Sequence, residues 1–306
     1  MKVLQGDYRA WEPLSQPTAV TIGVYDGVHL GHQRVLSTLC DTGLPVVVAT
    51  FRDHPIRTIA PEAAPPMLTT TAQRIELFER YGVSVVAILE FDDDLRRLPA
   101  EEFVEKVIVA KLRAVRVAVG RGFRFGHDQL GDVALLRRMG DQHGFDVDDL
   151  QIFETGVPVR STVIRALLEA GDVAAADRLL GRPFQLEGKV VAGDQRGREI
   201  GFPTANLETR DDVIVPGSGV YAVRLHWAGQ RHDGVANIGR RPTFGGTEYV
   251  VEAHVLDFSG DLYGERIVVD FIERLRAERK FDGVAALVEA IEADVALARG
   301  LLKEDG

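Results

Sequence analysis

The glycine-rich stretch of residues 193–206 combines groups that can hold a metal ion and a nucleotide phosphate. Thr204 and Asn206 are two residues apart, so their side chains point to the same side if Pro203 keeps the chain extended. A hydroxyl oxygen and an amide oxygen suit Mg²⁺, which takes a few protein oxygen ligands together with substrate phosphates. We therefore expect Thr204 and Asn206 to form a seat for Mg²⁺ or for a phosphate.

Just before this pair, glycines and arginines form a run that can approach a phosphate closely. Gly193 and Gly201 allow sharp backbone turns, and such turns expose N–H groups to an anion. Arg198 can add a bidentate contact to phosphate oxygens. These three residues are predicted to form a phosphate cradle. A turn followed by an edge strand is the alternative interpretation of the stretch.

Two histidines mark a second candidate site near the N-terminus. His29 and His32 are three residues apart at the start of a predicted helix, so both rings lie on one face, and Gly27 and Gly31 keep the backbone around them slim. The helix N-terminus favours negative charge, and two imidazole donors can stabilise charge that develops on a phosphate. The alternatives are a pair of turn histidines, or two metal ligands without a third.

Another helix start can supply partners for these histidines. Ser161 or Thr162 can cap the helix that follows them. Arg165 lies one turn further along and can reach a phosphate held at the same helix end. A solvated arginine is the alternative for Arg165.

The composition is that of an ordinary globular protein and argues against several function classes. The chain has 306 residues, 45% hydrophobic and 27% charged, which predicts two domains with ample core. A formal net charge of −10 argues against non-specific nucleic-acid binding. The single cysteine, Cys40, fits a reducing cytoplasm, and the pattern predicts neither a signal peptide nor a membrane span. We expect a cytoplasmic protein with small-molecule substrates and no nucleic-acid or membrane partner; its oligomeric state is left open.

The first 182 residues alternate apolar strands with amphipathic helices. Strands are predicted at 18–24, 45–50, 84–89, 115–119 and 149–153, and helices at 33–40, 72–81, 101–112, 132–143, 161–170 and 173–180. This alternation predicts a parallel sheet of the Rossmann-like α/β class. Such sheets bind ligands beyond the carboxyl ends of their strands, where the chain places the loops 25–32, 51–66, 120–131 and 154–161.

After residue 182 the pattern changes to alternating or β-branched runs separated by Gly- and Pro-rich turns. The runs cover 185–192, 219–225, 233–238, 248–257 and 266–272, and they predict an antiparallel barrel or sandwich. A helix over 284–302 closes the chain, with apolar residues that include Val284, Leu287, Val295 and Leu301. We therefore expect an α/β domain over residues 1–182 and a β domain over residues 183–306.

Several motifs, taken in their order, resemble those of the prokaryotic bifunctional riboflavin kinase/FMN adenylyltransferases (FAD synthetases). The stretch Gly-Val-Tyr-Asp-Gly-Val-His-Leu-Gly-His at 23–32 is similar to their nucleotidyltransferase motif, and Ser-Thr-Val-Ile-Arg at 161–165 to a second motif of that domain. Similar stretches in the second half lie at 201–207, 235–239, 241–244, 251–258 and 275–281. The resemblance covers nearly the whole chain.

This resemblance implies a nucleotidyltransferase domain followed by a riboflavin kinase β-barrel with a terminal helix. The barrel would phosphorylate riboflavin with MgATP to give FMN. The first domain would transfer AMP from a second ATP to FMN, giving FAD and pyrophosphate. By the same resemblance, the nucleotide-binding residues of the first domain would be Gly23, Tyr25, Asp26, Gly27, Gly31, Ser161, Thr162 and Arg165.

A kinase also needs a group that activates the attacking hydroxyl. Alternation along a strand places Glu252 on one face with His254, and the resemblance implies that Glu252 accepts the proton of the ribityl hydroxyl. Asn237 and Arg276 would bind the flavin. The alternatives are that Glu252 is a solvent-facing strand carboxylate, that Asn237 is a turn residue, and that Arg276 belongs to a solvated run of charges.

Three residues of the first domain depart from the family pattern. Arg52 stands in the place of the aspartate of Phe-Asp-Pro-His-Pro, Gly122 in that of an acidic or amide residue, and Arg160 in that of a serine. The exchanges remove carboxylate or hydroxyl groups and add two guanidinium groups. Three hypotheses stay open: retained FMN adenylylation, a transferase for a more anionic ligand, or a riboflavin kinase whose first domain only binds a nucleotide or flavin.

Overall fold

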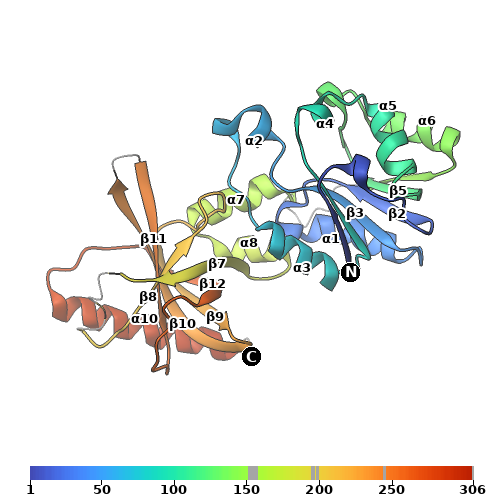
Figure 1. Cartoon of the computed structure of the whole chain (residues 1–306). Helices are drawn as coiled ribbons and strands as arrows, with labels where there is room; N and C mark the ends of the chain where they lie inside the picture. Colours follow the sequence, from blue (N-terminus) through green and yellow to red (C-terminus); the bar gives the residue numbers. More distant parts are fainter. Residues whose placement is uncertain (151–157, 194–196, 198–199, 244–245, 305–306) are drawn as a thin grey trace. The chain divides into compact units, whose positions relative to one another are not determined.

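The chain divides into two compact units, Met1–Ser161 and Thr162–Gly306 (Figure 1). The computed structural model describes residues 1–150, 158–193, 197, 200–243 and 246–304. The pattern of contacts groups the helices over residues 161–180 with the β-rich part that follows them, so they belong mainly to the second unit. The domain boundary expected from the sequence, between residues 182 and 183, stays a prediction.

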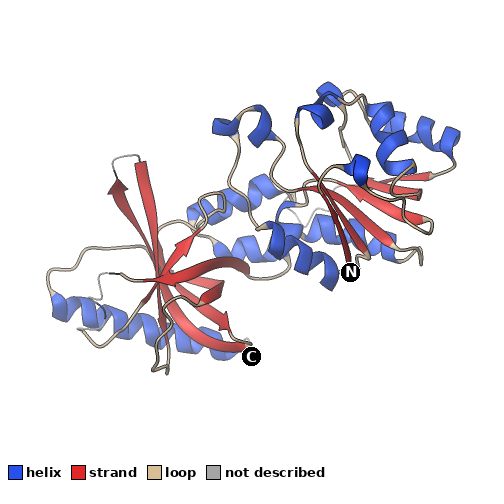
Figure 2. Cartoon of the chain, viewed as in Figure 1, coloured by secondary structure: helices blue, strands red, loops and turns tan. Residues whose placement is uncertain are grey.

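The first unit is built on a six-stranded sheet whose described pairings are parallel (Figure 2). The strand order is β1-β4-β3-β2-β5-β6. The strands are β1 (Lys2–Gln5), β2 (Thr18–Ile22), β3 (Val46–Phe51), β4 (Val85–Leu89), β5 (Ala114–Gly120) and β6 (Asp146–Leu150). The α-helices are α1 (Leu30–Cys40), α2 (Ile56–Ile59), α3 (Thr71–Arg80), α4 (Asp93–Arg97), α5 (Ala100–Phe103) and α6 (Val133–His143).

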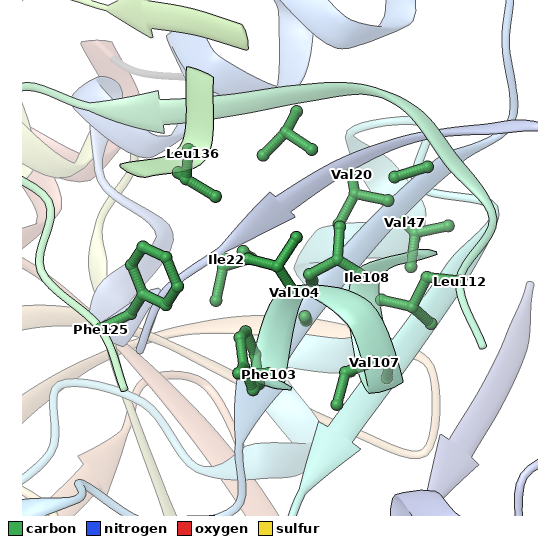
Figure 3. Close-up of a cluster of buried hydrophobic side chains, with 14 of the residues drawn as sticks. Val20, Ile22, Val47, Phe103, Val104, Val107, Ile108, Leu112, Phe125 and Leu136 are labelled. Atoms are coloured by element: carbon green, nitrogen blue, oxygen red, sulfur yellow. The ribbon is translucent and has the colours of Figure 1, made fainter. Parts of the chain in front are cut away.

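Both faces of this sheet are covered, which is why its strands are apolar runs rather than alternating ones. On one face, Val20, Ile22 and Val47 pack with Val104 and Ile108 in a single hydrophobic cluster (Figure 3). The intervening strand residues pack with apolar residues of α1 and α3 on the other face. The predicted parallel α/β sheet is therefore confirmed.

The structure corrects some predicted elements of this unit. The helix predicted over 101–112 is interrupted, because α5 passes into the π-helical turn η4 (Val104–Val109). Strand β1 was not predicted. The last strand is Asp146–Leu150, earlier in the chain than expected, and the remainder of its predicted range lies outside the described residues.

The direction of strand addition reverses beside β2. From β2 the chain adds β3 and β4 on one side, and it then crosses to place β5 against the other side of β2. Open parallel sheets bind ligands at the carboxyl ends of the strands where this reversal occurs. The loop after β2, which leads to His29 at the N-cap of α1 and to His32 in its first turn, therefore starts at the expected ligand-binding edge.

The second unit contains a closed antiparallel barrel in the strand order β10-β11-β8-β7-β12-β9 (Figure 2). The strands are β7 (Phe184–Val191), β8 (Ala205–Thr209), β9 (Gly219–Trp227), β10 (Gln230–Thr243), β11 (Gly246–Val255) and β12 (Arg266–Arg276). The helices are α7 (Ser161–Ala170), α8 (Val173–Leu180) and α10 (Val284–Glu304). The antiparallel prediction is confirmed, and the architecture is a barrel rather than a sandwich.

Helix α10 packs against β9, β10 and β12. Some of the apolar residues that the sequence predicted to face the barrel are exposed instead. Val284 is 62% exposed and Leu301 is 37% exposed. The buried positions of the helix are Ala290, Asp294, Ala298 and Leu302. These positions are four residues apart and so lie on one face of the helix, and the small side chains of Ala290 and Ala298 let that face approach the barrel closely. Among the helices of the described residues, none has the length and apolar character needed to cross a membrane.

Candidate active sites

The two histidines lie together at the turn between β2 and α1. Residues Asp26–Val28 form a short 3₁₀ turn (η2), after which His29 caps α1. Nδ1 of His29 accepts a hydrogen bond from the backbone N–H of His32 at 3.3 Å, and the two rings stack with centroids 3.6 Å apart. Because Nδ1 is an acceptor, the neutral His29 ring carries its proton on Nε2, which can donate to a phosphate oxygen.

The surroundings of His32 keep it neutral. Its ring centroid lies 4.6 Å from that of Tyr25, and its Nδ1 is enclosed without a hydrogen-bond partner among the described residues. Burial lowers the pKa of His32 well below its ordinary value, and electrostatic interaction with the neighbouring His29 and Arg74 lowers it further. A neutral imidazole can donate a hydrogen bond at this helix end without adding a fixed charge.

Asp26 ties the histidine turn to the segment that precedes α3. Its carboxylate accepts hydrogen bonds from the backbone N–H groups of Leu68, at 2.8 Å, and Thr69, at 3.3 Å. Thr69 Oγ1 in turn accepts from the N–H of Gly27 at 3.1 Å, and Ser161 Oγ donates to the backbone carbonyl of Asp26 at 3.0 Å. Asp26 is 2% exposed. The carboxylate therefore supports the turn, and a direct contact with a nucleotide stays a prediction.

The turn is held in a strained conformation. Gly27 has φ 79°, which suits glycine, but Tyr25 (φ 55°) and Val28 (φ 39°) also take positive φ. Such angles are unfavourable for residues with a Cβ and often occur at functional sites. A Cβ at Gly31 would lie 3.2 Å from the His29 ring, so glycine lets that ring rest against the start of the helix.

Three further predicted nucleotide-binding residues lie just after β2 and on α7. The N–H of Gly23 donates to the carbonyl of Ala49 at 3.0 Å, which joins the turn after β2 to β3. On α7, Thr162 is exposed and Arg165 is 7% exposed, and both belong to the second unit. Their nucleotide contacts stay predictions.

The three departures from the family pattern lie on the surface. The side chain of Arg52 is 53% exposed and lies 4.0 Å from Glu90, and Arg160 is also exposed. Gly122 has φ 76°. Asn and Asp are the other residues that tolerate this conformation. Glycine in the place of the family's acidic or amide residue is therefore compatible with the same backbone conformation, and only the polar side chain is lost.

In the barrel, strand register places three predicted site residues in one row. Asn206 on β8 is paired with Glu252 on β11, and Glu252 is paired on its other side with Asn237 on β10. Facing residues of antiparallel strands have Cβ atoms about 4.5–5.5 Å apart and share one face of the sheet. All three are half-buried, whereas Val251 and Ala253 beside Glu252 are buried. A carboxylate and two amides from separate motifs thus come together.

His254 adds a contact to which sequence reasoning gave no role. Its Nδ1 donates to the carbonyl of Pro203 at 2.8 Å, and its ring meets that of Phe202 edge-on at 5.5 Å. Thr204 follows Pro203 directly, so this contact holds the Thr204 turn against β11. The signal was present, because alternation places His254 on the same face as Glu252.

Two glycines leave room for the same turn. A Cβ at Gly193 would collide with the side-chain amide of Asn206, and one at Gly197 would collide with the backbone carbonyl of Phe202. The backbone of the glycine-rich segment therefore lies directly against the predicted metal ligand. Gly201 has φ 89°, a conformation that favours glycine. Arg198 lies outside the described residues.

The donors at this turn fit a hard cation such as Mg²⁺. Thr204 offers a hydroxyl oxygen and Asn206 an amide oxygen. In the part of the chain that the structure describes, no three His, Cys, Asp or Glu side chains gather as a metal cluster. With Thr204 and Asn206 as its ligands, a cation here would rest on neutral oxygens and on the phosphates of a nucleotide, which is an arrangement that suits Mg²⁺.

Arg276 is engaged within its own unit. Its guanidinium makes a two-pronged ion pair with Asp294 of α10, at 2.8–3.1 Å, and donates to the carbonyl of Ala277 at 3.2 Å. The Asp294 side chain is 6% exposed. A flavin contact through Arg276 stays a prediction, and in this conformation its hydrogen bonds go to Asp294 and Ala277.

A buried arginine near the histidine turn was also missed by sequence reasoning. Arg74 on α3 is 1% exposed and donates to the backbone carbonyls of Val24 and Arg52. Its only signal in the sequence is its place on the helix face that carries Leu77 and Phe78. Charged residues on such a face are seldom buried unless paired, so the sequence alone favours a solvated arginine.

The two units define a nucleotidyltransferase-type α/β domain and a riboflavin kinase-type barrel in one chain. Residues 12–163 match the family model for FAD synthetase, and residues 180–302 match that for riboflavin kinase. The bifunctional riboflavin kinase/FMN adenylyltransferase of Pseudomonas fluorescens is 42% identical over 94% of this chain and 94% of its own length. That of Escherichia coli (strain K12) is 39% identical over 98% of this chain and 97% of its own. The chain belongs to the bifunctional riboflavin kinase/FMN adenylyltransferase family.

A solved structure shares this fold over nearly its full length. It is described as a macrolide-efflux protein from Streptococcus pneumoniae and matches with a TM-score of 0.90 and 30% sequence identity. The match covers 98% of this chain and 99% of that one.

Proposed function

We propose that this protein phosphorylates riboflavin to FMN in its barrel and adenylylates FMN to FAD in its α/β domain, with ATP as the donor in both reactions. The observation that carries the kinase assignment is the cross-strand row of Asn206, Glu252 and Asn237 beside the turn that His254 holds. The stacked His29 and His32 at the carboxyl edge of the parallel sheet support the transferase assignment. Membership of the family supports both.

In the kinase step, the ribityl hydroxyl of riboflavin attacks the γ-phosphorus of ATP, and ADP leaves. Glu252 accepts the hydroxyl proton, which raises the nucleophilicity of the oxygen as it attacks. Asn237, on the next strand, orients the flavin substrate. The half-buried position of Glu252 limits competing water around the carboxylate.

Thr204 and Asn206 would hold Mg²⁺ against the phosphates of ATP. The ion would neutralise charge on the β- and γ-phosphate oxygens. The backbone at Gly193 lies directly against the side-chain amide of Asn206, which limits the room that the amide has to move and supports a fixed position for this proposed ligand. Gly201 and Arg198 complete the proposed cradle.

In the transferase step, a phosphate oxygen of FMN attacks the α-phosphorus of ATP, the bond to the bridging oxygen breaks, and pyrophosphate leaves. Nε2–H of His29 and the N-terminal end of α1 stabilise the negative charge that builds up on the phosphates. Asp26 and Ser161 keep the turn in the conformation that presents these donors. Arg165 and Thr162 are further proposed phosphate contacts.

Product analysis tests both halves of the proposal. Purified protein with riboflavin, ATP and Mg²⁺ is expected to give FMN and then FAD by chromatography, and FMN with ATP is expected to give FAD directly. Absence of FMN would overturn the kinase assignment. FMN without FAD, even at high enzyme concentration, would favour a kinase whose first domain only binds a ligand. Repeating the FMN reaction with each of the four nucleoside triphosphates tests whether Arg52, Gly122 and Arg160 alter nucleotide choice.

A further inference from the structure

Arg74 is an unusual residue for the centre of a globular unit, because it is charged and yet only 1% exposed. It lies on α3, four residues after the N-cap Thr70, whose side chain and Gln73 form a capping box. Side chains on a helix lean towards its N-terminus. The guanidinium is thereby directed back towards the loops at the carboxyl edge of the sheet.

Its two terminal nitrogens hold two different loops. Nη1 donates to the carbonyl of Val24 at 2.8 Å and to Thr50 Oγ1 at 3.3 Å. Nη2 donates to the carbonyl of Arg52 at 2.6 Å and to Thr71 Oγ1 at 3.1 Å. Val24 belongs to the loop after β2, and Arg52 to the loop after β3, the neighbouring strand.

Burying a charged guanidinium costs free energy, so the presence of an arginine at this buried position needs an explanation. Burial lowers the pKa of Arg74, the negative charges of Asp26 and Asp53 oppose that shift, and the guanidinium Nε is enclosed without a hydrogen-bond partner among the described residues. An apolar side chain of similar volume is often equally stable at a buried ionic position. Stability alone therefore does not explain an arginine at this position.

We propose that Arg74 is a positioning residue for adenylyl transfer, whose planar fork fixes the loop that leads to His29 and His32 relative to the loop after β3 and whose positive charge acts on His32. This inference rests on the proposed transferase function. A planar fork with two outward-facing nitrogens can hold both carbonyls at once, whereas a single ammonium group can hold only one of these loops firmly.

The charge of Arg74 also acts on His32. The rings of His29 and Tyr25 contact that of His32. Arg74 acts on His32 electrostatically, and Asp26 and Asp53 act on Arg74 in turn. Removing the positive charge of Arg74 therefore raises the pKa of His32 towards its ordinary value. Lysine at position 74 keeps the charge and loses the fork, so the two contributions can be separated.

The test compares Arg74→Met and Arg74→Lys with wild type, with Arg80→Met, an exposed residue of the same helix, as the control. We expect kcat for FAD formation from FMN to fall about 10- to 100-fold in both Arg74 variants, because small misplacements of catalytic groups have effects of that size. Riboflavin kinase activity, measured on the same preparations, is expected to stay within about twofold because the barrel belongs to the other unit. Trp11 fluorescence, in a Trp227→Phe background, reports on the folding of the first unit. Arg80→Met is expected to match wild type in both reactions.

A titration of His32 by NMR, assigned with a His32→Gln variant, gives a readout independent of turnover. The pKa of His32 is expected to rise in Arg74→Met and to stay near the wild-type value in Arg74→Lys. Wild-type kcat in Arg74→Lys overturns the proposal, and so does an unchanged kcat in Arg74→Met. If the first unit of Arg74→Met does not fold, Arg74→Lys decides. If wild-type protein makes no FAD, the transferase assignment fails, and an unshifted His32 in folded Arg74→Met then overturns the role of Arg74 as well.

Discussion

Asn206 and Glu252 face each other on the neighbouring antiparallel strands β8 and β11, although they come from separate motifs of the sequence. Facing residues of such strands point to the same side of the barrel. The proposed metal ligand and the proposed base are therefore held on one rigid surface, at a separation fixed by backbone hydrogen bonds. Asn237 on β10 extends the same row.

Glu252→Gln keeps the size of the side chain and removes its ability to accept a proton. Kinase turnover is expected to fall at least about tenfold, while FAD formation from FMN is retained. The measurement is FMN and FAD formation by chromatography in separate assays. Glu208→Gln, an exposed carboxylate on β8, serves as the control. Equal loss of both activities would show that the two sites do not act independently.

Gly193→Ala introduces a methyl group where the side-chain amide of Asn206 lies. The amide must move, so the Mg²⁺ concentration that gives half-maximal kinase activity is expected to rise about tenfold, an effect of about 1.4 kcal/mol. Gly283→Ala is the matched control, because a Cβ there would meet nothing within 4 Å. An unchanged Mg²⁺ dependence in Gly193→Ala would contradict the role given to Asn206.

Asp294→Asn breaks the two-pronged ion pair with Arg276 on the buried face of α10. Removing the carboxylate leaves the half-buried Arg276 guanidinium poorly compensated, so the free energy of unfolding of the second unit is expected to fall by about 1–3 kcal/mol. Of the two tryptophans, Trp227 lies in this unit, so its fluorescence during urea unfolding, in a Trp11→Phe background, reports on it alone. Glu292→Gln, on the exposed side of the same helix, is expected to change little. A similar loss in both variants would point to a general effect on the helix.

The stability of the first unit is expected to fall in mild acid because of His32. Its pKa is lowered in the folded state, whereas an unfolded histidine titrates near 6.5. Above that pH both states are neutral at His32 and its contribution is complete. Below it the unfolded chain binds a proton that the folded chain does not, which lowers the free energy of unfolding by up to about 1.4 kcal/mol per pH unit.

Urea unfolding followed by Trp11 fluorescence, in a Trp227→Phe background, measures this dependence between about pH 7.5 and 5.5. The control is His32→Gln, in which the side chain at position 32 does not titrate in this range. Its stability is expected to fall less steeply with decreasing pH than that of the protein with His32. Parallel pH profiles for the two proteins would mean that His32 is protonated in the folded state as readily as in the unfolded chain.

Local sequence was sufficient for the type of most elements and for the positions of the motifs. Apolar strands that alternate with amphipathic helices predicted the parallel sheet, and short β-branched runs predicted the antiparallel barrel. Helix starts could be placed because capping is local, as at Thr70, whose side chain bonds to the N–H of Gln73. Where local preference conflicted with packing the prediction was wrong, as for the π-helical turn after α5 and for the exposed Val284 and Leu301 on α10.

What the sequence by itself determined is the motifs and the candidate residues in them: His29, His32, Thr204, Asn206 and Glu252 stand in motifs with recognisable residue types and spacing. Only the tertiary structure decided which of them face one another and which charged groups are enclosed. The pairing of Asn206 with Glu252 depends on strand register, and the burial of Arg74 depends on carbonyls that two other strands deliver. Both are contacts between residues distant in the chain, and no local pattern encodes them.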